Sequence, residues 1–136
     1  MPVLETDFLK GLVDGSDRLH RHCIRALDKV MREGWMVASS SMLELDLLLK
    51  NTSISHADRH DVFESLKAEV DVEMVLPVNH AVLSEAAFLQ SKYSFTKFYF
   101  DSIHVSTAVL HDGIIVSSDR EFDQITEVKR TPLEKL

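Results

Sequence analysis

Residues 100–125, with the sequence FDSIHVSTAVLHDGIIVSSDREFDQI, decide the fold of this chain. Asp101 lies where a helix is expected to begin, and Gly113 is a natural end for that helix, because helices commonly end at a glycine in the left-handed conformation. The run Gly-Ile-Ile-Val predicts a short buried strand, and Asp119 comes just past its end. The pattern therefore predicts two carboxylates at one edge of a sheet, where open α/β sheets bind ligands.

The rest of the chain alternates between short apolar runs and segments with helical spacing. Strands are expected near residues 2–4, 35–38, 72–78 and 126–130, and helices near 16–33, 42–50, 53–70 and 81–90. If the first strand stays extended, Glu5 and Asp7 lie on the same side of it. This alternation predicts an α/β fold with a mainly parallel sheet that helices cover on both faces.

Length and composition indicate one globular domain. The chain has 136 residues, of which 45% are apolar, with only four glycines and three prolines. This composition excludes disordered and collagen-like chains, and we expect one domain over residues 1–136 with a frayed tail at about 129–136. Cys23 is the only cysteine, which excludes an intrachain disulfide and favours a reducing cytoplasm. The sequence predicts neither an export signal nor a membrane span.

The charge balance argues against general binding to a nucleic-acid duplex. The chain has 22 acidic and 15 basic side chains, and a net charge of −7, whereas duplex-binding proteins present a basic face. An acid-rich protein can still act on a phosphodiester if part of its negative charge surrounds metal ions.

Four sites along the chain place acids just after a predicted strand or in the first turn of the next helix. They are Glu5 or Asp7, Glu44, Asp101 and Asp119. Two carboxylates about 4 Å apart repel by on the order of 4 kcal/mol at an effective dielectric constant near 20, so protonation or a bound cation must relieve them. Hard oxygen ligands suit Mg²⁺ or Mn²⁺.

Each acid also has a structural explanation that the sequence leaves open. Ser41 and Glu44 match a capping box, as do Ser118 and Glu121 around Asp119. Asp101 is placed to cap a helix or to interact with its dipole.

Four stretches, in this order, resemble the PIN domain family, and within it the VapC-type ribonuclease toxins. They are Val-Leu-Glu5-Thr-Asp7 near the start, Val-Ala-Ser-Ser-Ser-Met-Leu-Glu44, Phe-Asp101-Ser-Ile-His-Val-Ser-Thr-Ala and Ile-Ile-Val-Ser117-Ser-Asp119. The resemblance covers nearly the whole chain. It implies a three-layer α/β/α fold with four to five strands, and a divalent-metal-dependent endoribonuclease that hydrolyses RNA phosphodiester bonds. It also implies the toxin of a toxin–antitoxin pair, with an antitoxin protein as partner, and a homodimer.

The resemblance implies a specific set of site residues. Glu44, Asp101 and Asp119 fall on the family's acidic positions, and Ser117 matches the small hydroxyl residue before the last acid. The first motif departs from the family, because Glu5 replaces the usual aspartate and Asp7 occupies the position of a small polar residue. Either acid, or both, can be the first metal ligand. We expect Asp7 to be the essential one, with Glu5 beside it.

Basic and aromatic side chains before Asp101 suggest contacts to RNA. Lys92, Tyr93 and Lys97 interleave charge with rings, a combination that binds single-stranded RNA, and Arg18 is a further candidate. The alternative is that the rings belong to the core and the lysines to the solvated surface. His104 lies one helical turn after Asp101, where a packing role is simpler than a contact to phosphate.

Two other classes of function compete with the nuclease. The acidic surface and the Glu5 departure suggest a PIN-fold module that binds RNA or protein without catalysis. The pair Glu5 and Asp7 also superficially resembles the paired acids of haloacid dehalogenase phosphatases, but that chemistry needs an aspartate nucleophile where Glu5 stands.

Overall fold

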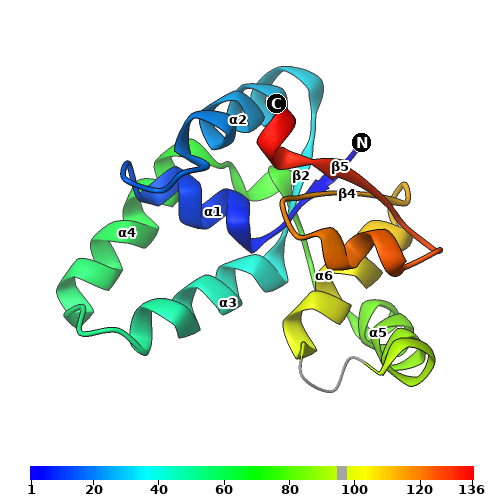
Figure 1. Ribbon diagram of the computed structural model, residues 1–136. Helices are drawn as coiled ribbons and strands as arrows, with labels where there is room; N and C mark the ends of the chain where they lie inside the picture. The colour runs from blue at the N-terminus through cyan, green and yellow to red at the C-terminus, as the bar shows by residue number, and fades with distance from the viewer. Residues whose placement is uncertain (95–97) are drawn as a thin grey trace.

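A computed structural model describes residues 1–94 and 98–136, and these residues form a five-stranded sheet and six α-helices (Figure 1). The strands are β1 (Val3–Leu4), β2 (Met36–Ala38), β3 (Val75–Leu76), β4 (Ile114–Ser117) and β5 (Lys129–Pro132). The helices are α1 (Thr6–Val13), α2 (His20–Glu33), α3 (Ser39–Lys50), α4 (His56–Glu69), α5 (His80–Tyr93) and α6 (Tyr99–Val109). Short 3₁₀ turns are η1 (Val72–Met74), η2 (Arg120–Gln124) and η3 (Leu133–Lys135). Among the described residues, no helix combines the length and the apolar character needed to cross a membrane.

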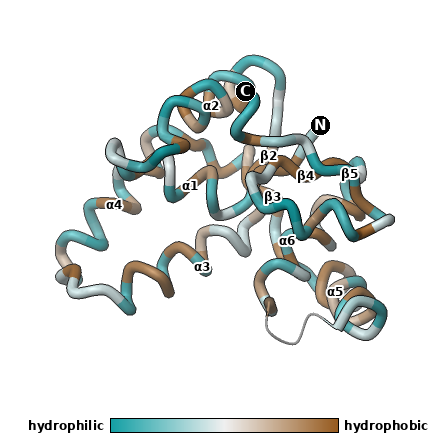
Figure 2. The backbone as a smooth tube through the Cα atoms, in the orientation of Figure 1, coloured by the Kyte–Doolittle hydropathy of each residue, from teal (hydrophilic) through white to brown (hydrophobic). Residues whose placement is uncertain are grey.

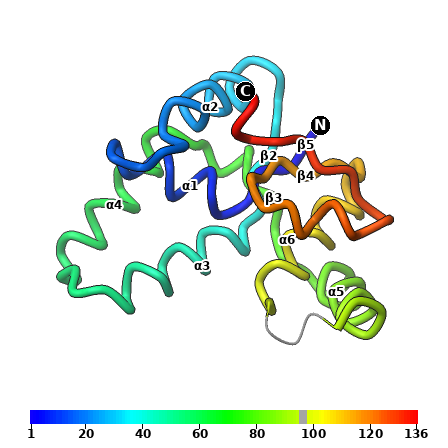
Figure 3. The backbone as a smooth tube through the Cα atoms, viewed as in Figure 1, coloured from blue at the N-terminus to red at the C-terminus, as the bar shows by residue number. Residues whose placement is uncertain are grey.

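The sheet is parallel throughout, which confirms the predicted α/β class. Its order is β3-β2-β1-β4-β5, so the first strand of the chain lies at the centre. Leu4 aligns with Val37 on one side and with Val116 on the other. Figure 3 shows the blue start of the chain beside the orange β4. The residues that follow β1 are therefore flanked by those that follow β2 and β4, and the acids of three motifs share one edge.

Alternation along the strands builds a three-layer structure. Leu4, Val37 and Val116 face one hydrophobic cluster, which includes side chains of α1, α2 and α4. Their neighbours Val3 and Ile115 face the other, which includes side chains of α5 and α6. Figure 2 shows apolar colour at the strands in the centre and alternating colour along the helices. The sheet is thus buried on both faces, as parallel sheets require.

The expectation that the first strand stays extended through Asp7 is wrong. The strand ends at Leu4 and helix α1 begins at Thr6, with Glu5 as its N-cap. The Glu5 carboxylate accepts a hydrogen bond from the Asp7 backbone N–H at 3.3 Å. This helix fits because Gly11 lies against the Cys23 side chain of α2, where a Cβ would collide with the sulfur. We expected only a turn there.

Several other boundaries also differ from the expected ones. Helix α6 begins at Tyr99, two residues before Asp101, and α3 begins at Ser39 rather than at residue 42. Strand β3 has only two residues, because η1 occupies the first part of the segment that we predicted as a strand.

The end of the chain is packed, in contrast to the frayed tail that we expected. Residues 129–132 form β5, and Leu133 is fully buried in the cluster with α1 and α2. The Leu136 backbone carbonyl accepts hydrogen bonds from His22 at 3.0 Å and Arg25 at 2.5 Å, both on α2. Figures 1 and 3 show the red C-terminal end beside this helix. Pairing with β4, the buried Leu133 and the two contacts to the Leu136 carbonyl together hold the tail.

Candidate metal centre

The turn from β1 into α1 delivers two carboxyl groups to the carboxyl edge of the sheet. Glu5 is the cap between strand and helix and is only 5% exposed, whereas Asp7 lies in the first turn of α1 and is partly exposed. A buried acid at this point must find polar partners, because an unpaired charge in the interior is costly.

Strand β4 supplies those partners at the same edge. Ser117 Oγ donates to Glu5 Oε1 at 2.7 Å, and it also lies 3.4 Å from Asp7 Oδ2. The Ser118 backbone N–H donates to Asp7 Oδ2 at 2.6 Å, and the Asp119 N–H donates to Ser117 Oγ at 3.0 Å. The predicted role of Ser117 as an orienting hydroxyl agrees with these contacts. The first and last motifs of the chain are directly linked by them.

Helices α3 and α6 add a second network, centred on His104. His104 is fully buried, with Nε2 at 3.2 Å from Glu44 Oε1 and 3.1 Å from the Thr6 hydroxyl. Its Nδ1 atom lies 2.7 Å from Ser40 Oγ. A carboxylate only accepts hydrogen bonds, so a neutral imidazole here carries its proton on Nε2 and accepts from Ser40. This contact fixes the position of the Glu44 carboxylate.

The two networks meet in a cluster with the geometry of a metal site. One ligand atom each from Glu5, Glu44 and His104 lies within 4.8 Å of the others. Beside them, Asp7 Oδ1 is buried and has no hydrogen-bond partner among the described residues. An unsatisfied buried carboxylate oxygen calls for an explanation, and a cation is one. The carboxylate oxygens fit a divalent ion such as Mg²⁺ or Mn²⁺, while the imidazole, whose Nε2–H donates to Glu44, positions one of these oxygen ligands.

Asp101 faces this cluster from the first turn of α6. Burial, and then the negative charges of Glu44, Asp119 and Glu121, raise the pKa of Asp101 to about 6, against the opposing effect of His104. The central acids, as we call Glu5, Asp7, Glu44 and Asp101, therefore act on one another electrostatically. Their ionised forms need a positive charge nearby.

The pKa values of Glu5 and Glu44 are shifted in opposite directions. Burial, followed by the charge of Asp7 and a hydrogen bond to it, raises the pKa of Glu5 well above its usual range. Burial also acts to raise the pKa of Glu44, but hydrogen bonds from His104 and Thr6 and the charge of Lys10 hold that pKa below its ordinary value. The surroundings thus favour the ionised form of Glu44 and the protonated form of Glu5.

The structure removes the helix-capping explanation for Glu44 and Asp101, although Asp101 still lies in the first turn of α6, where the helix dipole favours an acid. Ser41 and Glu44 form no capping box, because α3 begins at Ser39 without a side-chain cap and Glu44 turns to His104 instead. Asp101 caps nothing, since α6 begins before it. Asp119 does cap η2, accepting from the Glu121 N–H at 2.9 Å. Asp119 combines a structural role with its place beside Asp101.

The residues that we expected to contact RNA lie in different surroundings. Lys92 pairs with Glu127 at 2.5 Å, and the Tyr93 hydroxyl donates to the same carboxylate at 2.6 Å. These contacts tie α5 to the loop before β5. Arg18 lines a cavity with Asp7, close to the central acids. Lys97 lies outside the described residues.

Sequence reasoning missed the central position of His104, together with Thr6 and Ser40. A histidine on an apolar helix gives no sign of its partners, which come from residues 64 and 98 positions away in the chain. The one sequence clue was its spacing, since a residue one helical turn after Asp101 shares that residue's face.

Comparison with known proteins identifies the family. The PIN domain profile matches residues 3–128, so the chain belongs to the PIN domain family. Members of this family are generally nucleases, which supports a hydrolase. No curated protein sequence gives a match.

Solved structures with a similar fold include one described as a toxin–antitoxin complex. FitAcB from Neisseria gonorrhoeae aligns with a TM-score of 0.75 and 16% identity over 100% of both chains. VapBC2 from Rickettsia felis, bound to a promoter DNA fragment, aligns with a TM-score of 0.74 and 10% identity over 95% of this chain and 96% of that one. A complex from Klebsiella pneumoniae aligns with a TM-score of 0.63 and 16% identity, with the same coverage as VapBC2. At these identities the comparison shows the fold alone.

Proposed function

We propose that the protein is a divalent-metal-dependent endoribonuclease and the toxin of a toxin–antitoxin pair. The observation that carries the proposal is the buried cluster of Glu5, Glu44 and His104, with their ligand atoms within 4.8 Å. Asp7, Asp101 and Asp119 complete the set of acids, and Ser117 orients Glu5.

In this proposal, side chains of this protein hold the divalent ion. Glu44, oriented by His104, would hold the ion together with Glu5 and Asp101, and binding at a pH below the raised pKa of either of these two acids would release its proton. The bound ion supplies Lewis-acid stabilisation of the charge that develops on the phosphodiester. Arg18 and Lys97 stay candidates for RNA contacts, whereas Lys92 and Tyr93 would have to release Glu127 before they bind RNA.

The direct test is cleavage of single-stranded RNA by purified protein with Mg²⁺ or Mn²⁺. Fragments should form, and EDTA should abolish them. Asp101→Asn should lose this activity, while Asp123→Asn serves as a matched control because Asp123 pairs with Arg130 instead of facing the cluster. If the two variants cut equally well, the assigned site is wrong.

A non-catalytic binding module is the second candidate, because Glu5 already has a protein partner in Ser117. A carboxyl group with only a structural role would accept the same hydrogen bond from Ser117 without any metal. Titration calorimetry distinguishes the two functions: absence of Mn²⁺ binding at millimolar concentration would favour the binding module.

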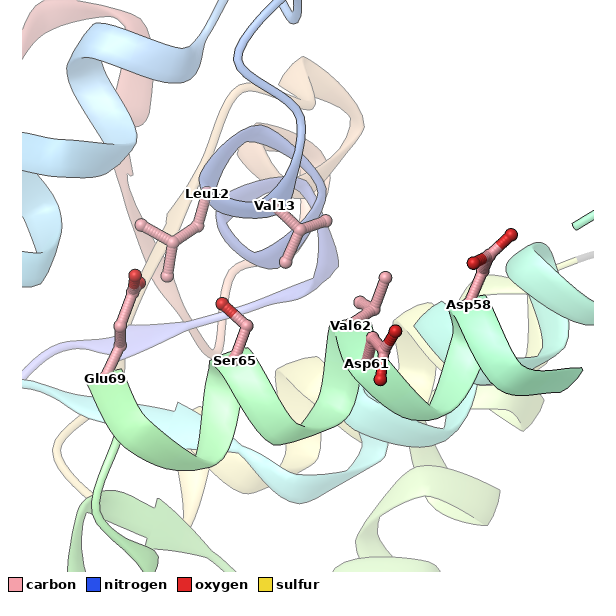
Figure 4. A pocket seen from close by; sticks show the side chains of 7 residues that line it. All are labelled: Leu12, Val13, Asp58, Asp61, Val62, Ser65 and Glu69. Carbon is pink, nitrogen blue, oxygen red and sulfur yellow. The ribbon is translucent and has the colours of Figure 1, made fainter. Parts of the chain in front are cut away.

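We infer an antitoxin as the protein partner, since the similar structures include complexes of this kind. A cavity of about 320 Å³ between α1 and α4 is a candidate contact surface (Figure 4). Its apolar residues are Leu12, Val13 and Val62, and its acids are Asp58, Asp61 and Glu69. This combination suits a basic amphipathic segment.

We also propose a homodimer and, from the single cysteine, a cytoplasmic location.

A further inference from the structure

A second cavity lies directly beside the central acids and has a different character. Its volume is about 410 Å³, within the usual range for ligand pockets. It is lined by Asp7, Lys10, Asp17, Arg18, Leu19 and Ser118. Because Asp7 belongs to both, the cavity and the candidate metal centre share a wall.

Each of the two acids that line the cavity has one carboxylate oxygen bound to a backbone N–H. Asp7 Oδ2 accepts from the Ser118 backbone N–H at 2.6 Å, and Asp17 Oδ1 accepts from the Leu19 N–H at 2.8 Å. Asp17 thereby shapes the turn that enters α2. The acids support the backbone around the cavity and leave its cations unpaired.

The two cations have no ion-pair partner within the described part of the chain. Lys10 and Arg18 are both exposed and form no salt bridge there, although the protein has more acids than bases. Some other bases are paired, such as Arg59 with Asp46 and Arg130 with Asp123. Lys10 and Arg18 are distinguished by lining one cavity together. Two unpaired cations around one cavity can bind an anion without first breaking an ion pair.

Lys10 and Arg18 both lie close to the candidate metal centre. Lys10 lies one turn after Thr6 on α1, and its charge acts on Glu44. Arg18 approaches the same cavity from the loop between α1 and α2. We propose that Lys10 and Arg18 bind an RNA phosphate that neighbours the bond to be cleaved. The inference rests on the proposed function and makes these two residues positioning residues of that site.

The physical reason is the arrangement of charge. An RNA strand must bring a negative phosphate up to a cluster of carboxylates, which repels it. Cations beside the cluster offset that repulsion, and they bind the strand through its backbone regardless of sequence. The phosphate held there fixes which bond reaches the metal centre. The simplest alternative is that Lys10 only stabilises the C-terminal turn of α1 through the helix dipole.

Binding of a labelled single-stranded RNA, measured by fluorescence anisotropy in EDTA over a range of salt, tests the inference without cleavage. Lys10→Ala and Arg18→Ala should each weaken binding about tenfold, as expected for loss of a charge-assisted hydrogen bond. Each should also reduce the slope of log K against log salt by about 0.7, the value for one phosphate contact on a single strand. Lys10→Arg should retain binding.

Lys129→Ala is the matched control, because Lys129 is an exposed lysine at the opposite edge of the sheet, aligned with Ile114. It should bind RNA like the wild type. If the Lys10→Ala/Arg18→Ala double variant binds as tightly as this control, with the same salt slope, the inference is wrong. A lower Tm with unchanged RNA binding would also overturn it, in favour of the helix-dipole role.

Cleavage in Mn²⁺ separates this inference from the proposed function. The double variant should show a raised KM with kcat nearly unchanged. If the wild type cuts RNA and the double variant cuts it with the same KM, only the phosphate site fails. If the wild type binds RNA without cutting it, the nuclease proposal fails, and the binding data still test whether Lys10 and Arg18 bind a phosphate. A wild type that neither binds nor cuts RNA would overturn both.

Discussion

Two groups of carboxylates in this protein carry the same charge in opposite surroundings. Asp123 and Glu127, which we call the paired acids, face cations. Arg130 contacts the two oxygens of Asp123 at 2.9 and 3.1 Å, and Lys92 binds Glu127. The central acids face one another instead. Glu5 lies beside Asp7, and Asp101 lies within reach of the charge of Glu44.

Proton affinity shows the consequence of this difference. Hydrogen bonds from Lys92 and Tyr93 lower the pKa of Glu127 to about 2, whereas burial and neighbouring charge raise the pKa of Asp101 to about 6. The paired acids are neutralised within the protein and link the last strand to α5 and η2. Among the described residues the central acids form no ion pair with a lysine or arginine, although the charge of Lys10 acts on Glu44, and they leave room for a cation from solution. The fold therefore uses carboxylates for cohesion in one region and accepts their repulsion in another.

The largest expected effect comes from removing one central acid. Glu44→Gln should lower RNA cleavage by about a thousandfold, the upper range for loss of one electrostatic group in an active site. It should also remove the rise in Tm that Mn²⁺ gives the wild type, because only a bound ligand stabilises the folded state. Cleavage assays and thermal melts measure the two effects.

The same substitution at a paired acid tests the comparison directly. Glu127→Gln should keep both the cleavage and the Mn²⁺-dependent rise in Tm, since Glu127 lies with Lys92 outside the cluster. Equal behaviour of Glu44→Gln and Glu127→Gln would show that the two groups of acids do not differ in function.

The pH dependence of metal binding should follow Asp101. Because its pKa is raised to about 6, the rise of Mn²⁺ affinity with pH should become less steep, by about a factor of ten per pH unit, above pH 6, where Asp101 has no proton left for the ion to displace and only the proton of Glu5 remains. A carboxyl group with a raised folded pKa contributes stability below its unfolded pKa and loses it as pH rises through the folded pKa. Metal-free wild type should therefore lose stability relative to Asp101→Asn between about pH 4 and pH 6.

Calorimetry with Mn²⁺ and melting curves in EDTA measure these two quantities. A pH-independent difference in Tm between wild type and Asp101→Asn would contradict the raised pKa. The paired acids give the opposite sign: Glu127 stabilises the fold above its ordinary pKa of 4.5, and this contribution falls as pH drops toward 2. Since Glu127 is solvated, salt should weaken this effect.

The departure in the first motif gives a smaller and sharper prediction. Asp7→Asn removes the charge that helps raise the pKa of Glu5, while the amide oxygen can still accept from Ser118. Mn²⁺ binding should persist and shift to lower pH. Glu5→Gln should weaken Mn²⁺ binding more at neutral pH, because Glu5 belongs to the cluster with Glu44 and His104. If Asp7→Asn instead loses metal binding as fully as Glu44→Gln, Asp7 is the essential ligand, as the sequence suggested.

The central acids show which parts of the structure could be predicted. The parallel sheet followed from the alternation of apolar runs with helical segments, and its ligand-binding edge followed from Asp101 and Asp119 on either side of a strand of four residues. Helix α1 did not follow, because its cap is a buried glutamate whose partner, Ser117, lies 112 residues away. A local pattern cannot reveal a cap that depends on a distant strand.

The assignment of RNA contacts had the same limitation. Lys92 and Tyr93 form a pattern of charge and ring that suits RNA, but local sequence gives no information on Glu127, which lies 35 residues after Lys92. In the same way, the sequence around Arg18 gave no information on the cavity beside it or on the presence of Lys10 at the same cavity. A basic side chain is free for RNA only where the fold provides no acid, and that depends on tertiary packing.

The smallest effect is expected at Lys92, where the comparison between the two groups can still fail. Lys92→Ala should lower Tm slightly, and high salt should remove this difference, because the pair with Glu127 is exposed and screened. RNA cleavage should be unchanged, since the lysine is already occupied by an acid. The measurement is a pair of melts at low and high salt beside the cleavage assay. A raised KM for RNA with an unchanged Tm would mean that Lys92 leaves Glu127 to bind the strand, and the paired acids would then take part in function as well as in cohesion.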